Sequence, residues 1–338
     1  MKSALLCTLV LNLGLPLEMG AQEEMTVHEL KATAETTHIS FFDASLEPVL
    51  SINSGDFVKL ETASVSPGYL QSQGVEKERI PPELFAAYEG RDFAERGDHT
   101  LSGPIFVNGA EPGDMLEIRI ISVDLRLPVA GQGINPNLFP DLFPNPTQRV
   151  HWLDLEQRTV EFAPGVVVPL KPFWGVIGVA PPPEMGRVGS SAPNFFGGNM
   201  DNRDLVSGSI LYLPVHNQGA LLSIGDGHGA QGYGEVSGSA IETSLKGEIQ
   251  VILHKGRELQ WPQAETSTHY ITMGLHEDLD EAAKIAMMEM IDYLVTVRGL
   301  DRDTALLLAS VAMDMVVTQV VDGTKGIHAM IPKGIFDN

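Results

Sequence analysis

Two glycine-rich segments of the sequence concentrate the side chains that could do chemistry. Segment 196–201 reads Phe-Gly-Gly-Asn-Met-Asp, and segment 224–235 reads Ile-Gly-Asp-Gly-His-Gly-Ala-Gln-Gly-Tyr-Gly-Glu. Glycine tolerates positive φ and weakens regular structure, so this density indicates backbone bent around a site. The alternative is a solvated glycine loop whose acids only satisfy local turns. The side chains here that suit a hard or borderline divalent cation are Asp201, Asp226, His228 and Glu235.

The spacing of Asp226 and His228 predicts that both side chains reach one ion. They stand two residues apart after the apolar run 220–224, and alternate residues of a strand share a face. Glu235 is close enough in sequence to loop back as a ligand or as a base. Asp201 would join them from the neighbouring turn.

Other polar residues of these segments suit substrate binding. Asn199 can donate a hydrogen bond to a polarised carbonyl, and Gln231 offers a donor and an acceptor to an amide. His99 precedes a predicted strand and is a candidate for a distant ligand, as is His38. Taken alone, each of these two histidines is more often a hydrogen-bonded structural residue.

These groups together match the needs of metal-assisted hydrolysis, which are a held cation, an open coordination position and a base for the incoming water. We expect a water activated by the cation to be the nucleophile. Glu235 would take its proton and pass it to the departing amine, which cannot leave as an anion.

Short strands predominate in the elements that must position this site. Gly and Pro number 34 and 22, and only 20% of residues are charged, which favours many strands over a helical bundle. Segments 49–62 and 105–120 each read as two strands around a turn, at 54–56 and 111–114, with Asp56 and Asp114 as turn residues. The repetition predicts stacked hairpins. The proline-containing segment 128–147 predicts a long excursion.

The pattern changes to helical near Asp278. Apolar residues at helical spacing predict a helix over 281–297, ended by Gly299, and Asp301 caps a second helix running to about Val317. The fold class expected is mainly β (β-rich α+β), with a large antiparallel β-sandwich-like core and a C-terminal α-helical hairpin. We expect a signal peptide over 1–21 and one domain over 22–338. Within this domain, 22–275 is expected to be β-rich and 278–320 to form the helical hairpin.

The N-terminus reads as an export signal. Lys2 is followed by an apolar stretch over 4–16, and small residues precede a cleavage point near Ala21. This predicts an extracytoplasmic protein, periplasmic or secreted, with an uncleaved anchor as the alternative. Cys7 lies inside the signal, so the mature chain would hold no cysteine nucleophile or disulfide. The net charge of −22 argues against nucleic acid and anionic membrane surfaces as partners.

The chain resembles the acetamidase/formamidase family from about residue 38 to 332. The blocks that carry the resemblance occur in order and are individually short. They are 38–43, 48–50, 55–56, 99–104, 109–114, 175–181, 197–201, 211–214, 225–228, 230–232, 234–235 and 318–322.

This resemblance implies a β-rich homo-oligomer, a dimer or larger, that hydrolyses short amides such as formamide or acetamide to carboxylate and ammonia. It implies a divalent metal, zinc first, with Ca²⁺ and Mn²⁺ as alternatives. Carried onto this sequence, the metal and catalytic set is His99, Asp201, Asp226 and His228. Glu235 would be the general base and acid, with Gln231 and Asn199 orienting the substrate.

Two features depart from the family pattern. Tyr233 stands where many members have an acidic residue, which would change the polarity or size of the pocket. The export signal is unusual for enzymes of intracellular nitrogen scavenging, and suggests a different amide.

Two rival functions remain. A serine amidase is suggested by Ser190 and Ser191 after Gly189, although Ala192 and Pro193 follow where that mechanism needs a Gly/Ser-rich loop and a lysine. The other rival is an exported β-rich binding protein that keeps the fold without catalysis, since fold alone does not decide function.

Overall fold

The computed structural model describes residues 25–90, 99–136 and 138–336. Its helices are α1 (Pro67–Ser72), α2 (Pro82–Tyr88), α3 (Leu279–Thr296) and α4 (Arg302–Ala312), with 3-10 turns η1 (Lys77–Arg79), η2 (Pro183–Met185) and η3 (Lys333–Ile335). Its strands are β1 (Val27–Leu30), β2 (Thr37–Ile39), β3 (Phe41–Phe42), β4 (Leu50–Ile52), β5 (Phe57–Glu61), β6 (Thr100–Val107), β7 (Met115–Ile134), β8 (Thr147–Asp154), β9 (Thr159–Ala163), β10 (Val166–Pro169), β11 (Phe173–Gly178), β12 (Val188–Gly189), β13 (Gly197–Asn199), β14 (Ile210–Pro214), β15 (Leu222–His228), β16 (Glu242–His254), β17 (Gln263–Glu265), β18 (His269–His276), β19 (Asp314–Gln319) and β20 (Lys325–Pro332).

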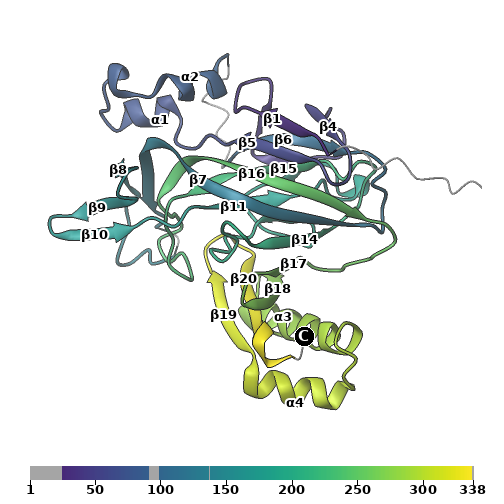
Figure 1. The fold of residues 1–338 in the computed structure, drawn as a ribbon. Helices are drawn as coiled ribbons and strands as arrows, with labels where there is room; N and C mark the ends of the chain where they lie inside the picture. The colour runs from purple at the N-terminus through teal and green to yellow at the C-terminus, as the bar shows by residue number, and fades with distance from the viewer. Residues whose placement is uncertain (1–24, 91–98, 137, 337–338) are drawn as a thin grey trace, which may run out of the picture.

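The body of the protein consists of two layers of mainly antiparallel strands. In the first layer the long strands β7 and β16 pair with each other and cross the molecule, with β5 added to β16 and β14 to β7 (Figure 1). In the second layer β15 pairs with β11 on one side and β6 on the other. Buried apolar side chains from both layers form one core. Trp174 of β11 lies so close to Gly247 of β16 that a Cβ there would be 2.6 Å from its ring. The predicted mainly β fold class is confirmed.

The two layers join at the end of β15. Its last residue, His228, pairs with Glu242, the first residue of β16. A site built on His228 therefore lies at the corner where the second layer meets the first.

The predicted turns at 54–56 and 111–114 are present, but the predicted hairpins are wrong. Asp56 accepts from the Asn53 N–H and Asp114 from the Glu111 N–H, as turn residues do. The flanking strands do not pair with each other in the described residues: β4 pairs with β6, whereas β5 pairs with β1 and β16. Each turn instead carries the chain from the second layer to the first. Turn chemistry alone does not distinguish strands that pair from strands that stack.

The predicted excursion over 128–147 is shorter than expected. Strand β7 continues to Ile134 and includes Pro128. This proline is tolerated because the register of β7 against β16 shifts there: Leu125 pairs with Leu245 and Ala130 with Thr243, so β7 bulges between them. The strands β9 and β10 form a hairpin that projects from the body (Figure 1).

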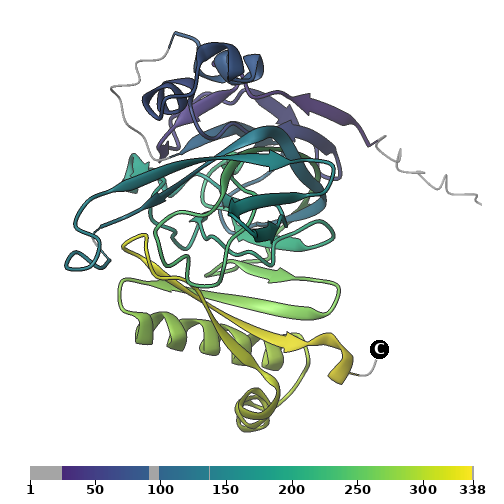
Figure 2. The same ribbon diagram turned by 90° about the vertical axis from the view of Figure 1, so that its left-hand side faces the viewer.

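The C-terminal helices and strands lie below the body in Figure 2, and their strands join it through β17, which pairs with β14 and with β18. Asp301 caps α4 as predicted, Asp278 caps α3, which begins two residues before the predicted start at 281, and Gly299 between the helices has a φ of 71°. Helix α3 packs on β18 and β20. The prediction that the second helix runs to Val317, and the hairpin to 320, is wrong. Helix α4 ends at Ala312, and β19 follows because the β-branched run 316–318 pairs with β20.

The predicted signal peptide over 1–21, with Cys7, lies outside the described residues. Of the helices that the structure describes, none has the length and apolar character needed to cross a bilayer.

Candidate metal centre

The end of β15 presents Asp226 and His228 on one face, as the spacing predicted. The glycines that alternate with them, Gly225 and Gly227, face the other way against neighbouring backbone: a Cβ on Gly225 would lie 2.4 Å from the Thr100 carbonyl oxygen, and one on Gly227 would lie 2.3 Å from that of Thr243. The alternation of Gly with Asp and His thus lets β15 pack tightly on one face and carry ligand-type side chains on the other.

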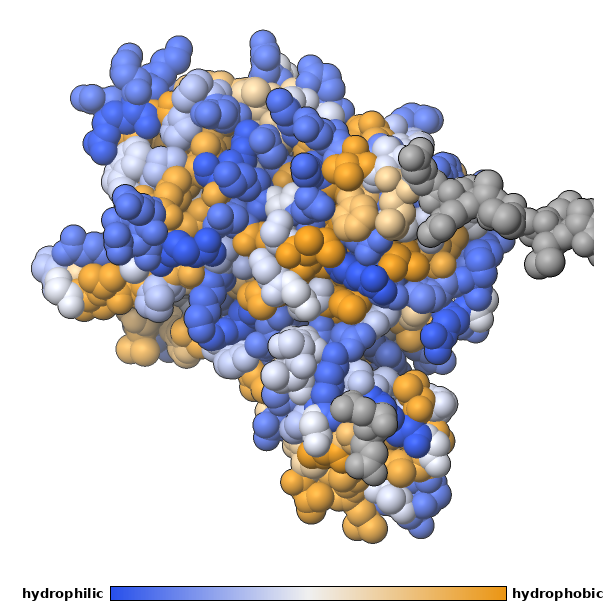
Figure 3. Space-filling model, in the orientation of Figure 1, coloured by the Kyte–Doolittle hydropathy of each residue, from blue (hydrophilic) through white to orange (hydrophobic). Residues whose placement is uncertain are grey.

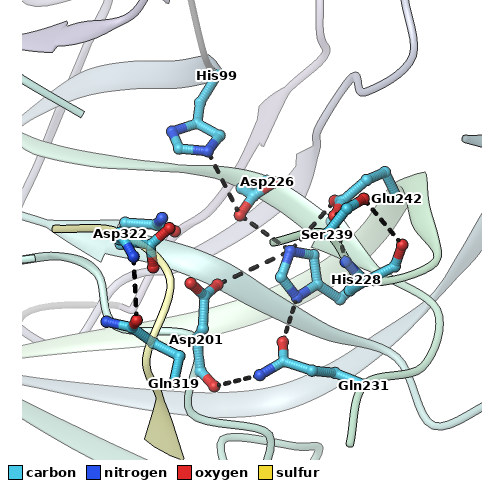
Figure 4. Close-up of polar contacts among 12 residues, drawn as sticks. His99, Asp201, Asp226, His228, Gln231, Ser239, Glu242, Gln319 and Asp322 are labelled. Atoms are coloured by element: carbon cyan, nitrogen blue, oxygen red, sulfur yellow. Dashed lines mark hydrogen bonds and ion pairs between the residues drawn. The ribbon is translucent and has the colours of Figure 1, made fainter. Parts of the chain in front are cut away.

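Carboxylate oxygens from three segments converge on Nε2 of His228 (Figure 4). Oδ2 of Asp226 lies 3.0 Å away, Oε2 of Glu242 3.1 Å and Oδ1 of Asp201 3.8 Å. The ligand atoms of Asp201, Asp226 and His228 lie within 4.8 Å of one another, and all three residues are buried. The structure therefore brings together three of the predicted metal ligands.

Gln231 sets the orientation of the His228 ring. Its Nε2 donates to the backbone carbonyl of Asp201 at 2.9 Å, so its Oε1 must be the atom that faces Nδ1 of His228 at 2.8 Å. An amide oxygen only accepts, so Nδ1 carries a proton. Nε2 is thereby directed at the carboxylates. A hydrogen bond to the other ring nitrogen orients metal-binding histidines in the same way. This placement fits the positioning of His228 and not the substrate-orienting role predicted for Gln231.

Asp201 reaches the site from the segment after β13. Its N–H donates to the Gly175 carbonyl at 3.2 Å, and its φ is 48°. Gly175 of β11 faces the centre: a Cβ there would lie 2.4 Å from Oδ1 of Asp201 and 2.5 Å from Oδ2 of Asp226. A side chain at Gly175 would thus push these two carboxylates out of place.

Glu235 also joins the cluster, through two overlapping groups. A carboxylate oxygen of Glu235 lies within 4.8 Å of a ring nitrogen of His228 and a carboxylate oxygen of Glu242. In the second group, a carboxylate oxygen of Glu235 lies within the same distance of those of Asp201 and Asp322. Its chain segment is fixed by backbone hydrogen bonds from Gly234 N–H to the Thr318 carbonyl and from Val320 N–H to the Gly234 carbonyl. These bonds bring the end of β19 beside Glu235.

His99 lies at the edge of the cluster. Its Nε2 is 3.8 Å from Oδ2 of Asp226, while its Nδ1 contacts the Ser190 hydroxyl at 3.0 Å. His38, the other histidine considered, contacts the Ser223 hydroxyl at 3.0 Å and belongs to none of the described ligand groups. His99 is therefore within reach of a cation at Asp226, and His38 is placed as a structural histidine.

The charges of the cluster are strongly coupled. Burial raises the pKa of Asp201 well above its ordinary value, and the Asp322 carboxylate raises it further. Burial and the Asp201 carboxylate do the same to the pKa of Glu235. Burial would raise the pKa of Asp226, but the imidazoles of His228 and His99 bring it below its ordinary range. Burial would lower the pKa of His228, but Asp226 and Glu242 hold it well above 6.5.

Asn199 and Tyr233 belong to none of the described ligand groups. The Asn199 amide donates to the Ser191 carbonyl at 2.9 Å, and its buried Oδ1 has no hydrogen-bond partner. The Tyr233 hydroxyl donates to both oxygens of Asp204, at 2.9 and 3.1 Å, and the side chain is half exposed.

Ser190, from the serine-amidase alternative, is fully buried, and among the described residues its hydroxyl contacts Nδ1 of His99 at 3.0 Å and not a lysine. That arrangement does not match the lysine-dependent serine mechanism considered from the sequence.

Two acidic residues of the cluster escaped the sequence analysis. Asp322 ends the segment 318–322, which carried part of the family resemblance, so that segment was the available signal. Glu242 is brought to His228 by the pairing of β15 with β16. The proximity of Glu242 to His228 follows from the strand register, and the spacing of the two residues in the sequence does not reveal it.

The donor set fits a divalent cation. Imidazole and carboxylate ligands suit zinc, and manganese as well. Oδ1 of Asp201 and Oε2 of Glu242 are buried and have no hydrogen-bond partner, although they lie beside the His228 nitrogen. Buried charged oxygens without partners are costly, and a cation among them would satisfy them.

Comparison with known proteins gives consistent matches. The sequence profile of the Acetamidase/Formamidase family matches residues 27–192 and 190–338. An acetamidase of Mycolicibacterium smegmatis is 28% identical over 51% of this chain and 57% of its own length, so the match spans little more than half of that relative. The crystal structure of a predicted acetamidase/formamidase from Thermoanaerobacter tengcongensis covers 92% of this chain and 97% of its own, with a TM-score of 0.79 and 28% identity. The crystal structure of an acetamidase from Bacillus halodurans covers 91% of this chain and 98% of its own, with a TM-score of 0.77 and 31% identity.

Proposed function

The chain belongs to the acetamidase/formamidase family, and from this membership we propose that it hydrolyses the C–N bond of short linear amides to a carboxylate and ammonia with a divalent cation. The observation that carries the metal dependence is the convergence of Asp226, Asp201 and Glu242 oxygens on Nε2 of His228. Carboxylates and an oriented imidazole at one point are a ligand set, and nothing in a purely structural role requires them to meet there.

We assign the cation to Asp226, His228 and Asp201, with His99 and Glu242 as further donors at the edge. A zinc ion held there would activate a water and polarise the amide carbonyl. Gln231 keeps the His228 nitrogen directed at the centre.

Glu235 is the group proposed to move the proton. Its buried carboxyl lies beside His228 and Glu242, and burial with the Asp201 charge holds its pKa well above 4.5. A carboxyl with a raised pKa can take a proton near neutral pH and return it to the leaving nitrogen. Asn199 is the proposed donor to the oxyanion, through the amide proton that Ser191 does not engage.

Burial of the centre supports small substrates. Asp201, Asp226, His228 and Glu235 are each less than 10% exposed. From this burial and the family membership we propose amides of the size of formamide and acetamide.

We also propose that the chain is exported and that it assembles into a dimer or larger homo-oligomer. The export rests on the signal-like N-terminus over 1–21. The assembly is supported by apolar side chains on α4, where Leu307 is 70% and Val311 83% exposed; orange atoms gather over this helix in Figure 3. Exposed apolar groups of this kind favour contact with another chain. Light scattering after size exclusion tests the assembly.

The test of the activity is ammonia release from formamide, acetamide and larger amides, before and after chelation and after Zn²⁺ is returned. We expect release that is lost on chelation, restored by the ion and abolished in Asp226→Asn. Asp141→Asn, an exposed acid between β7 and β8, should behave as the parent protein. A protein that binds no metal and releases no ammonia from any amide would instead be the non-catalytic binding protein.

A further inference from the structure

We propose that a cavity beside Gln231 is a binding site for a small organic carboxylate that carries a short apolar chain. The cavity has a volume of about 760 Å³, and Gln231, Phe173 and Ile241 form part of its wall. A volume of this order is typical of small-molecule sites. In the described part of the chain, none of the residues assigned to the cation lines this cavity. The carboxylate site is therefore separate from the metal centre and does not depend on the proposed function.

Apolar side chains from several strands form much of the cavity wall. Phe162 and Val168 come from the β9–β10 hairpin, Phe173 from β11 and Met330 from β20. Phe162, Val168 and Met330 pack against the core but are only partly buried, so each keeps apolar surface for a ligand. The Phe162 ring is held in place because it stacks on the buried ring of His151, with the ring centroids 5.3 Å apart. This wall suits a short hydrocarbon chain.

The charged side chains of the lining have the opposite sign to the protein as a whole. The basic residues of the lining are Lys171, Arg203 and His269, and Asp204 is its one acid among the described residues. The whole chain instead has 44 acidic residues against 22 lysines and arginines. A basic cavity in an acidic protein selects for anions.

Asp204 already has partners for its charge, whereas the two cations do not. Both oxygens of Asp204 accept from the Tyr233 hydroxyl, at 2.9 and 3.1 Å, and Oδ2 is 3.2 Å from Nε2 of His328. Within residues 25–90, 99–136 and 138–336, neither Lys171 nor Arg203 forms an ion pair with an acid. An anion in the cavity therefore meets two cations without competing carboxylates.

Arg203 is positioned to bind a carboxylate with two hydrogen bonds. Its Nη1 donates to the Gln231 carbonyl at 2.9 Å, and its guanidinium carbon lies 4.4 Å from the centre of the Tyr233 ring. These contacts hold the plane of the guanidinium. Among the described residues, this is the one hydrogen bond of the Arg203 side chain, so Nε and Nη2 can still donate. The planar guanidinium matches the two oxygens of a carboxylate.

Lys171 supplies a second positive charge from the segment before β11. Its backbone N–H donates to the Gly229 carbonyl at 2.8 Å, which fixes the point from which the side chain leaves. The residue is exposed, so its ammonium group can reach a ligand at the cavity without loss of packing. One carboxylate between Lys171 and Arg203, with its chain against the apolar wall, uses both parts of the cavity.

The test is isothermal titration calorimetry of hexanoate against the zinc-loaded full chain. We expect one hexanoate per chain. Acetate, the acid that hydrolysis of acetamide would yield, has the charge without the chain and should bind at least about 10-fold more weakly, since it lacks four methylene groups. Hexan-1-ol has the chain without the charge and should not displace hexanoate.

Lys171→Gln and Arg203→Gln should each weaken hexanoate binding by about 10-fold or more, because each removes a charge-assisted hydrogen bond. Lys59→Gln, at an exposed position of β5, removes the same charge as Lys171→Gln and should leave the affinity unchanged. Asp226→Asn alters the metal centre and should still bind hexanoate. Circular dichroism verifies that each variant is folded.

Four results would overturn the site. These are no binding of hexanoate, equal affinity for acetate and hexanoate, an affinity that Lys171→Gln and Arg203→Gln leave unchanged, and loss of binding in Asp226→Asn. The last result would place the carboxylate at the metal centre. A protein that releases no ammonia from any amide would contradict the proposed function, and the calorimetry would still decide the carboxylate site.

Discussion

Oε1 of Gln231 lies 2.8 Å from Nδ1 of His228, and this contact determines which nitrogen of the histidine faces the acids. The other end of the same amide is bound to the Asp201 backbone, so the amide cannot turn over without losing a hydrogen bond. One residue outside the cluster therefore links the orientation of His228 to the segment that carries Asp201.

Gln231→Leu should weaken zinc binding by about 10- to 100-fold, as loss of a hydrogen bond to a metal-binding histidine typically does. The leucine keeps the size of the side chain but cannot hold the ring of His228. The measurement is competition for Zn²⁺ against a chelating dye. Gln148→Leu, at an exposed position of β8, is the control and should leave the affinity unchanged. Equal affinities for the two variants would show that Gln231 does not orient a ligand.

Gly175→Ala should reduce both bound metal and ammonia release, although no ligand is altered. The new methyl group would lie 2.4 Å from Oδ1 of Asp201 and 2.5 Å from Oδ2 of Asp226. Gly232→Ala is the matched control from the glycine-rich segment, since nothing lies within 4 Å of a Cβ there. Metal content and initial rates of the two variants are compared. A Gly175→Ala protein with full metal content and rate would place the functional centre elsewhere.

The metal-free protein should lose stability as pH rises from about 4 to about 8. Burial and the Glu235 carboxylate raise the pKa of Asp322 to about 8, far above the 3.8 of an unperturbed aspartate. Between these values the folded chain keeps a proton that the unfolded chain has released, so the free energy of unfolding falls with pH. Asp201 and Glu235 act in the same direction.

Chemical denaturation at several pH values measures this slope. Asp322→Asn should show a shallower slope, because the amide does not titrate, and bound Zn²⁺ should stabilise the protein more at pH 8 than at pH 5. A metal-free protein whose stability rises steadily over this range would contradict the carboxylate cluster.

Tyr233→Phe should cost about 0.5–1.5 kcal/mol of stability, the usual contribution of a hydrogen bond. The hydroxyl donates to Asp204, which is also 3.2 Å from His328. Phenylalanine keeps the ring that Arg203 covers at 4.4 Å, so the change reports on the hydroxyl alone. Thermal unfolding measures the loss. An unchanged stability with an altered preference among amides would instead place Tyr233 at the substrate.

Much of the centre could be predicted from sequence because its parts are local. Asp226 and His228 share a strand face, the chain becomes helical near Asp278, and the cap residue Asp301 begins a helix where it was expected. These signals depend on neighbours a few residues away.

The remaining parts depend on tertiary structure. Glu242 reaches His228 through the register of two strands, and Asp322 reaches Glu235 through a bridge between Gly234 and Gln319. The end of α4 was misplaced because the apolar run continues into β19, where pairing with β20 overrides the helical pattern. In each case strand pairing decides the contact, and the spacing of neighbouring residues does not show it.

The central claim is that side chains of separate segments meet around one cation, and anomalous diffraction tests it most directly. Crystals equilibrated with Zn²⁺ are measured on both sides of the zinc absorption edge. We predict a zinc peak about 2.0–2.2 Å from Nε2 of His228 and from an oxygen of Asp226. Crystals with no zinc at these residues, from a protein that still hydrolyses amides at its full rate, would contradict the account.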